Sequence, residues 1–195
     1  MAKIGVLALQ GDVREHLASV AEIGATGIEV RTIDQLAAVD GLIIPGGEST
    51  TIAKLARIFD LFEPIRAAIN SGLPTFGTCA GLILLADRIL DGIVGQETFG
   101  GLDVTVRRNA FGHQSESFET TLEFAGISGV PVAAAFIRAP IITEVGPNAE
   151  NLAELSDGRV VAVKQKHLLG ISFHPEISGE PRVHEYFLKE FVNKA

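Results

Sequence analysis

Three short apolar segments of this chain each end in a glycine-containing turn that leads into a helix-like segment. The segments are residues 3–9, 41–44 and 73–76, and the turns after them contain Gln10-Gly11, Pro45-Gly46-Gly47 and Gly77-Thr78-Cys79-Ala80-Gly81. Apolar strands that alternate with helices are typical of a parallel sheet covered on both faces. The carboxyl ends of parallel strands share one edge of the sheet, where ligands bind. The sequence therefore predicts a three-layer α/β fold, with a mostly parallel central sheet and a site at this edge.

The N-terminal half of the chain contains the predicted helices that would cover this sheet. They are expected between Asp12 and Gly24, at residues 51–59 and at residues 80–90. Asp12 and Glu15 resemble a capping box at the start of the first helix. The segment at residues 80–90 consists of good helix formers. A further strand is expected at residues 28–31.

The C-terminal half has a different pattern between Asp103 and about Lys164. Short strand-like segments are separated by turns at residues 103–106, 117–120, 132–136 and 160–163. They predict an antiparallel or mixed extension of the sheet. A buried strand at residues 168–173 follows. Pro181 then begins a closing helix, whose apolar face consists of Val183, Tyr186, Phe187 and Phe191. Because the chain shows no internal repeat or flexible linker, residues 1–195 are expected to form a single domain.

Composition argues against several classes of function. The chain has 24 acidic and 16 basic residues and a net charge of −8, which disfavours nucleic acid as a partner. Its single cysteine, Cys79, excludes an internal disulfide and a multi-cysteine metal site, and a free catalytic thiol suits the reducing cytoplasm. No secretory cleavage site follows residues 3–9, and no stretch is long enough to span a membrane. We therefore expect a cytoplasmic protein without membrane or nucleic-acid partners.

Cys79 is the candidate nucleophile. It lies within G-T-C-A-G, residues 77–81, between a predicted strand and a predicted helix. A nucleophile at the tip of such a turn has a strained backbone and needs small residues two positions away on each side, as in the G-x-S-x-G elbow. The N-terminus of the helix favours a thiolate and can bind an oxyanion. A lone cysteine is more often a small buried hydrophobe, but the glycines and the strand-to-helix context favour the nucleophile.

His174 and Glu176 are the candidate base and the carboxylate that orients it. His174 follows the predicted strand at residues 168–173, so it falls at the same edge of the sheet as Cys79. Pro175 favours an extended His174, and extended residues two apart point to one side, so Glu176 can approach the imidazole. A carboxylate there would set the tautomer and stabilise the imidazolium. Without Cys79, H-P-E would be interpreted as a surface turn.

The loop after residues 41–44 is the third part of the predicted site. Gly46 and Gly47 allow backbone N–H groups to approach a ligand closely. Taken alone, Pro-Gly-Gly is as often a simple turn, but here it falls at the same strand edge as the candidate nucleophile and base. The N–H groups of Gly47 and Ala80 are then the natural pair of oxyanion donors. This chemistry needs no metal and no organic cofactor.

Six segments carry a specific resemblance to a known family. They are L-Q-G at residues 9–11, P-G-G-E-S-T-T at 45–51, F-G-T-C-A-G at 76–81, V-R-R-N-A-F-G at 106–112, F-I-R-A-P at 136–140 and S-F-H-P-E at 172–176. From about Lys3 to Phe187, the chain resembles the glutaminase subunits of pyridoxal 5′-phosphate synthase, the PdxT type. The elbow and H-P-E alone would indicate only a class I glutamine amidotransferase, whose sheet is flavodoxin-like. His113 departs from the resemblance, because arginine is expected there.

The resemblance implies an activity and a set of site residues. Such subunits hydrolyse L-glutamine to L-glutamate and ammonia, and pass the ammonia to a separate PdxS-type synthase subunit in a hetero-oligomeric complex. It implies Cys79 as nucleophile, His174 as general base and acid, and Glu176 as orienting carboxylate. The implied glutamine-binding positions are Gly47, Glu48, Ser49, Arg108, Ile137 and Arg138. An arginine suits a substrate carboxylate, but the residues alone do not decide whether Arg107 or Arg108 faces it.

Two alternatives stay open from the sequence. The elbow would also serve a stand-alone hydrolase or peptidase, and stimulation of glutamine turnover by a synthase subunit would separate these. A regulatory binding module would keep the fold without the chemistry, and a covalent adduct of a glutamine analogue on Cys79 would exclude it. We also hypothesise that Gln10, near the end of the first strand, couples partner docking to the oxyanion hole.

Overall fold

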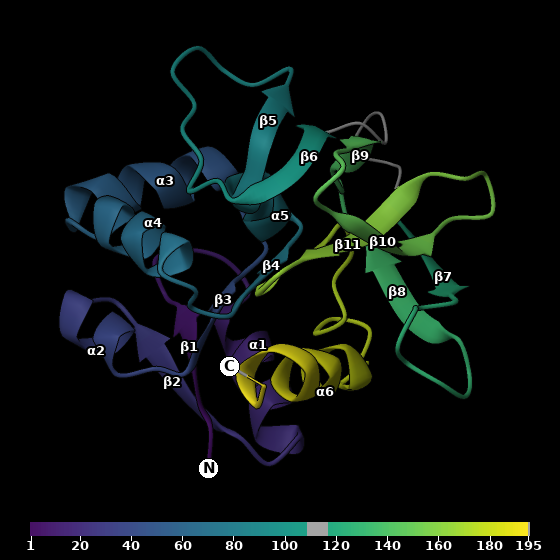
Figure 1. Cartoon of the computed structure of the whole chain (residues 1–195), viewed down its shortest axis with the longest axis horizontal. Coiled ribbons are helices and arrows are strands. Elements are labelled where there is room, and N and C mark those ends of the chain that lie inside the picture. The colour runs from purple at the N-terminus through teal and green to yellow at the C-terminus, as the bar shows by residue number, and fades with distance from the viewer. Residues whose placement is uncertain (109–116, 195) are drawn as a thin grey trace.

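The computed structural model describes residues 1–108 and 117–194, and in this part of the chain the central feature is a seven-stranded sheet (Figure 1). From one edge to the other, its strands are β10 (Glu150–Glu154), β11 (Val160–Gln165), β12 (Leu168–Ile171), β4 (Thr75–Thr78), β3 (Gly41–Ile44), β1 (Lys3–Leu7) and β2 (Thr26–Val30). The strands from β12 to β2 pair in parallel, whereas β11 and β10 pair antiparallel. The predicted, mostly parallel central sheet is confirmed.

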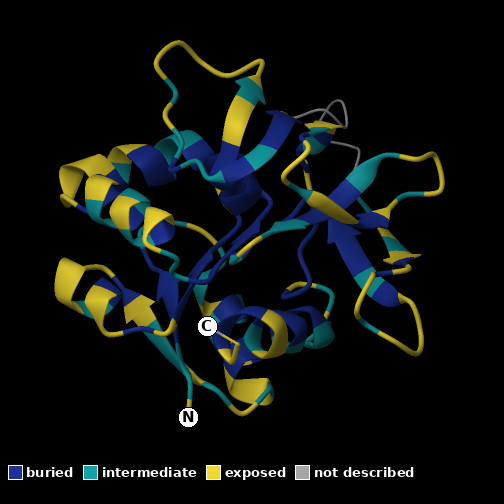
Figure 2. Ribbon diagram, viewed as in Figure 1, coloured by how far each residue is buried: buried dark blue, intermediate teal, exposed yellow. Residues whose placement is uncertain are grey.

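Helices cover both faces of this sheet and complete three layers (Figure 1). One face is covered by α1 (Val13–Glu22) and by α6 (Arg182–Phe187), which continues as a π-helical turn at Leu188–Val192. The other face is covered by α2 (Ile33–Ala37), α3 (Ser49–Ile58), α4 (Phe62–Asn70) and α5 (Ala80–Leu85). Alternate residues of β3 enter the two cores, with Leu42 and Ile44 on the α3 side and Ile43 on the α1 side. The central strands are therefore buried on both faces (Figure 2).

The segment between Asp103 and Lys164 is divided among several sheets. Its strands β11 and β10 extend the central sheet in the antiparallel direction. Within the described residues, a three-stranded sheet contains β5 (Ala86–Leu90), β6 (Leu102–Arg107) and β9 (Ile141–Val145), and an antiparallel pair contains β7 (Phe118–Leu122) and β8 (Val132–Phe136). Strand propensity is visible in the sequence here, but tertiary packing decides which sheet each strand joins.

The predicted helix at residues 80–90 is wrong beyond Leu85. There α5 ends, and the following residues form β5, which pairs in parallel with β6. Arg88 Nε donates a hydrogen bond to Thr105 Oγ1 at 2.8 Å, and Arg88 Nη1 lies 2.9 Å from Asp103 Oδ1. Both partners lie on β6. These contacts, together with the ladder between the strands, override the helical propensity of the segment.

The other predicted elements are present with small shifts of their ends, and α2, α4, β9 and β10 were not predicted. The start of α2 does carry a recognisable signal, because the Thr32 side chain accepts a hydrogen bond from Gln35 N at 3.3 Å. The apolar face predicted for the closing helix is buried throughout. The helices in the described part of the chain lack the combination of length and apolar character that a membrane crossing requires.

Candidate active site

Cys79 lies on a strained turn between β4 and α5. Its φ of 48° and ψ of −100° are unfavourable for residues with a Cβ, at a cost of about 1–3 kcal/mol. Two glycines make the turn possible. A Cβ on Gly77 would lie 2.5 Å from the carbonyl carbon of Gly81, and a Cβ on Gly81 would lie 2.1 Å from the carbonyl oxygen of Ile44. Because Cys79 N also donates to Ile171 O at 2.9 Å, the turn is tied to β12. This is the geometry of a nucleophile elbow.

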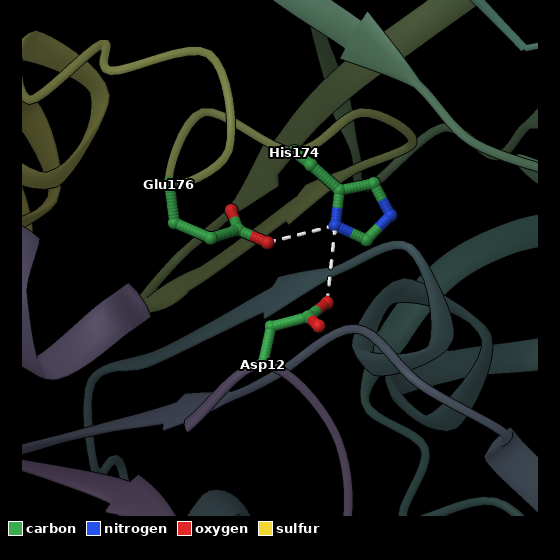
Figure 3. Close-up of side chains that lie close together, drawn as sticks. All are labelled: Asp12, His174 and Glu176. Carbon is green, nitrogen blue, oxygen red and sulfur yellow. Dashed lines mark hydrogen bonds and ion pairs between the residues drawn. The ribbon is translucent and has the colours of Figure 1, made fainter. Parts of the chain in front are cut away.

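His174 and Glu176 lie together where the chain leaves β12 (Figure 3). His174 Nδ1 is 2.7 Å from Glu176 Oε1, and the two residues are only 4% and 8% exposed. The backbone N–H of His174 donates to Ala135 O at 2.9 Å, so β8 holds the base in place. The structure thus brings the imidazole and the carboxylate into contact across Pro175.

Asp12 is a second carboxylate at the imidazole, which the sequence analysis missed. Its Oδ2 lies 3.4 Å from His174 Nδ1 (Figure 3). The predicted capping box is wrong, because among the described residues the Asp12 side chain makes no capping hydrogen bond to α1. Gly46 leaves room for the contact, since a Cβ there would lie 2.3 Å from His174 Cε1 and 2.8 Å from Asp12 Oδ2. The available signal was the position of Asp12 just after β1, at the edge where the site was expected.

The surroundings of His174 favour its charged form. Burial alone would lower the pKa of His174, but hydrogen bonds with Asp12, Cys79 and Glu176 outweigh burial and raise the pKa to about 12. Both carboxylates approach Nδ1, so Nε2 is the ring nitrogen left to serve Cys79. Burial raises the pKa of Glu176, and its hydrogen bond with His174 opposes this increase. The 2.7 Å contact with the charged imidazole of His174 favours the ionised form of Glu176. The site therefore provides the imidazolium that a thiolate needs.

Asp12→Asn is expected to lower the reactivity of Cys79 at neutral pH, because the imidazolium that favours the thiolate is weakened. The substitution removes one of the anions that raise the pKa of His174, so the imidazolium loses its proton at a lower pH. The Asp12 side chain is 35% exposed, and solvent screens part of its charge, so we expect reactivity at neutral pH to fall only about two- to fivefold. The measurement is the rate of Cys79 alkylation by iodoacetamide as a function of pH. An unchanged alkylation rate at neutral pH would mean that Asp12 does not act on the imidazole.

A cavity of about 330 Å³ contains the candidate nucleophile and base. Besides Cys79 and His174, it is lined by Gln10, Gly11, Asp12, Gly47, Glu48, Ile137, Arg138 and Ile177. Four of the predicted binding positions, Gly47, Glu48, Ile137 and Arg138, therefore lie at the same cavity as the nucleophile. The volume is at the lower end of the range for small-molecule sites. A cavity of about 380 Å³ beside α3 is larger, but neither the nucleophile nor the base lines it.

Ser49 and Arg108, the other two predicted binding positions, lie behind the cavity wall. Arg108 Nη2 donates to Glu48 Oε1 at 2.7 Å, and Arg108 Nη1 donates to Gln96 Oε1 at 2.6 Å. Gln96 Nε2 donates in turn to the hydroxyl of the buried Ser49 at 3.1 Å. Arg107 is half exposed and pairs with a surface aspartate at 3.2 Å. Arg108 is therefore the arginine on the side of the cavity, and it reaches the cavity through Glu48.

Gln10 supports the glycine loop. Its Oε1 accepts a hydrogen bond from Glu48 N at 2.8 Å, and a Cβ on Gly47 would lie 2.6 Å from the same oxygen. The φ of 149° at Gly47 is one that residues with a Cβ rarely adopt. Residues 109–112 and His113, which the sequence analysis singled out, lie outside the described residues.

Known proteins with the same sequence pattern and fold identify the family. The model of the SNO glutamine amidotransferase family matches residues 6–193. The chain is 61% identical to the pyridoxal 5′-phosphate synthase subunit PdxT of Leifsonia xyli subsp. xyli, over 95% of this chain and 94% of the relative. It is 58% identical to the subunit of the same name from Streptomyces avermitilis, over 95% of this chain and 92% of the relative. A crystal structure of a glutamine amidotransferase shares 46% identity with a TM-score of 0.89, over 95% of this chain and 97% of the other. The chain belongs to the SNO glutamine amidotransferase family.

Proposed function

We propose that this chain is the glutaminase subunit of a pyridoxal 5′-phosphate synthase. It hydrolyses L-glutamine to L-glutamate and ammonia, and it delivers the ammonia to a separate synthase subunit of the PdxS type. The observation that carries the proposal is Cys79 on its strained elbow, in one cavity with His174, in a chain that its PdxT relatives match over 95% of its length. Glutamine is the substrate of the family, and the cysteine provides the means of cleaving its side-chain amide.

The proposed reaction has two steps at Cys79. In the first, the Cys79 thiolate attacks the amide carbon of glutamine, and the oxyanion accepts hydrogen bonds from the N–H groups of Gly47 and Ala80. His174 gives its proton to the leaving nitrogen, so ammonia departs and a glutamyl thioester remains. In the second step, His174 takes a proton from water, and the hydroxide attacks the thioester to release glutamate and the thiolate. Glu176 orients the imidazole and stabilises its charge in both steps. Side chains and water supply every proton, so the proposed reaction uses no cofactor.

The glutamine-binding residues are proposed from the walls of the cavity. Glu48 and Arg138 line it and carry opposite charges, which suits the α-ammonium and α-carboxylate groups of glutamine. Arg108 contacts Glu48 at 2.7 Å and holds that carboxylate from behind. The remaining proposed positions are Gly47, Ser49 and Ile137.

The partner follows from the product, because the proposed role of ammonia requires a second protein to use it. A hetero-oligomeric complex with the synthase subunit is therefore part of the proposal, and a cytoplasmic location suits the free thiol of Cys79. Gln10 is the proposed link between docking and catalysis. It bonds Glu48 N next to Gly47, so docking that shifts Gln10 would shift the loop that carries an oxyanion donor.

Ammonia release from L-glutamine tests the proposed function. We expect release that rises when a synthase subunit is added, together with covalent labelling of Cys79 by a chloroketone analogue of glutamine. If no ammonia is released with or without the synthase subunit, the proposal fails. A release rate that does not change when the synthase subunit is added would favour a stand-alone hydrolase. In the same assay, Gln10→Ala should weaken the stimulation. Unchanged stimulation and complex formation would remove Gln10 from the coupling.

A further inference from the structure

Two histidines form a buried pair directly behind the proposed catalytic carboxylate. His16 on α1 and His184 on α6 are 0% and 1% exposed, and His16 Nδ1 lies 2.9 Å from His184 Nε2. His16 Nε2 lies 3.1 Å from Thr78 Oγ1 and 3.6 Å from Glu176 Oε1. Both rings pack edge-on against Phe76. Burying the ring nitrogens of two histidines costs free energy, and apolar side chains would fill the same space without that cost. Packing alone therefore does not explain the pair.

The available donors and acceptors determine the direction of this chain of contacts. Both imidazoles are neutral, because burial lowers the pKa of His16 well below its usual range and the pKa of His184 to about 4. Each neutral ring has one N–H and one acceptor nitrogen. If His16 donated through Nδ1, its Nε2 lone pair would face the Glu176 carboxylate, and the N–H on His184 Nδ1 would have no acceptor among the described residues. The opposite assignment avoids both costs, so His184 donates from Nε2, and the Nε2–H of His16 donates to Thr78 Oγ1 with Glu176 Oε1 3.6 Å away.

This N–H connects the two halves of the catalytic site. Glu176 is the carboxylate in contact with His174, and its side chain has no exposed area, so N–H donors are needed to offset its desolvation. Thr78 directly precedes Cys79, whose backbone is strained. One imidazole therefore contacts both the carboxylate that orients the base and the turn that carries the nucleophile.

We propose that His16 is a positioning residue for the hydrolysis, with His184 as the residue that sets its tautomer. The ring of His16 is hydrogen-bonded to Thr78 and lies against Glu176, so it keeps the distance between the orienting carboxylate and the nucleophile elbow constant through both steps. This inference rests on the proposed glutaminase function and deepens it. It extends the site from the sheet edge into the interior, between α1 and α6.

The first test compares His16→Leu with His16→Gln in the chain assayed with its synthase subunit. Leucine removes the N–H and roughly keeps the volume, whereas the amide N–H of glutamine can reach the position of Nε2. We expect His16→Leu to lower kcat about 10- to 100-fold with KM nearly unchanged, because a misplacement of about 1 Å has an effect of this size. His16→Gln should recover most of kcat. His167→Leu is the control, since His167 bonds Ile69 O at the other end of β12 and should leave activity unchanged.

The second test is the pH dependence of kcat/KM. The titratable groups that face Glu176 are His174 after β12, Asp12 just before α1 and His16 on α1. His184 on α6 lies behind His16, and Cys79 acts on Glu176 through His174. Loss of the His16 N–H removes a dipole that lies 3.6 Å from the charged carboxylate, so the pKa of Glu176 rises. The acid limb of His16→Leu should therefore move to higher pH. A merely structural role would lower the melting temperature and leave this limb in place.

Two results would overturn the inference. The first is a folded His16→Leu, by circular dichroism and thermal melting, with wild-type kcat and an unmoved acid limb. The second is a folded His16→Gln that is as impaired as His16→Leu. If His16→Leu does not fold, His184→Leu replaces it, because loss of the donor frees the tautomer of His16 and should move the same limb. A wild-type profile in that variant would count against the inference.

A failure of the glutaminase proposal can be distinguished from a failure of the inference about His16. If the wild-type chain releases no ammonia from glutamine, the glutaminase proposal fails. The positioning role is then measured by alkylation of Cys79 with iodoacetamide across the pH range, which needs no glutamine. The profile of His16→Leu should differ from wild type there as well, and identical profiles would overturn the inference.

Discussion

Cys79→Ala is expected to lower kcat for glutamine hydrolysis by at least about 10⁴-fold, because the thioester cannot form without the sulfur. The measurement is ammonia release from L-glutamine in the presence of the synthase subunit. Added ammonium salt is the control. If the chain serves to supply ammonia, ammonium should restore product formation by the complex that contains Cys79→Ala. A Cys79→Ala variant with wild-type ammonia release would show that another residue is the nucleophile.

Cys79→Gly separates the strain on the elbow from the chemistry. Glycine adopts a φ of 48° without the steric cost that cysteine and alanine share. Relief of about 1–3 kcal/mol of strain should exceed the roughly 0.4–1 kcal/mol that the extra freedom of glycine adds to the unfolded chain. We expect Cys79→Gly to be as inactive as Cys79→Ala. Its melting temperature should be higher than that of Cys79→Ala by about 2–4 °C for each kcal/mol of unfolding free energy gained. Equal melting temperatures of the two variants would contradict stored strain at this turn.

Glu176→Gln is the second large effect, with an expected loss of about 100- to 1,000-fold in kcat and little change in KM. Loss of the orienting carboxylate from a catalytic triad lowers kcat about 10⁴-fold. A smaller loss is expected here because Asp12 keeps a carboxylate 3.4 Å from His174 Nδ1. Removal of one anion also lowers the pKa of His174, so the alkaline limb of kcat/KM should move to lower pH. The measurement is the pH profile of ammonia release by Glu176→Gln beside that of the wild type.

The double variant Glu176→Gln with Asp12→Asn measures how far the two carboxylates substitute for each other. Residues that contact one shared group are not additive. If Asp12 compensates for the loss of Glu176, the double variant should lose more activity than the product of the two single losses. A loss equal to that product would show that the two carboxylates act independently on His174.

Much of the fold was predictable from the sequence, because its main determinant is local. Continuous apolar runs that end in glycine turns require burial on both faces, which a parallel sheet between helix layers provides. The helix predicted at residues 80–90 was wrong beyond Leu85 because long-range contacts decide the structure there. That segment has helical propensity throughout, but Arg88 meets Thr105 and Asp103 on β6, and such long-range partners leave no local signal.

The candidate site divides in the same way. Cys79 was identifiable because the close approach of Gly77 to Gly81 is a constraint within five residues of the sequence, which the motif records directly. The contact of His174 with Glu176 was predictable because extended residues two apart share a side. By contrast, Arg108 was assigned to the substrate by resemblance, and the structure places it behind Glu48.

The sequence by itself determined the α/β class and singled out the candidate nucleophile on its elbow and the candidate base with its neighbouring carboxylate, since each depends on residues that are close along the chain. Only the tertiary structure decided the other groups that act on the imidazole and its carboxylate. Asp12 and His16 reach His174 and Glu176 from the opposite end of the chain. Their roles depend on the packing of α1 beside the sheet edge. The physical reason is that the effect of a charge or an N–H group depends on its distance in space, which the separation along the sequence does not give. The sequence alone shows these two residues as a helix cap and an unremarkable histidine.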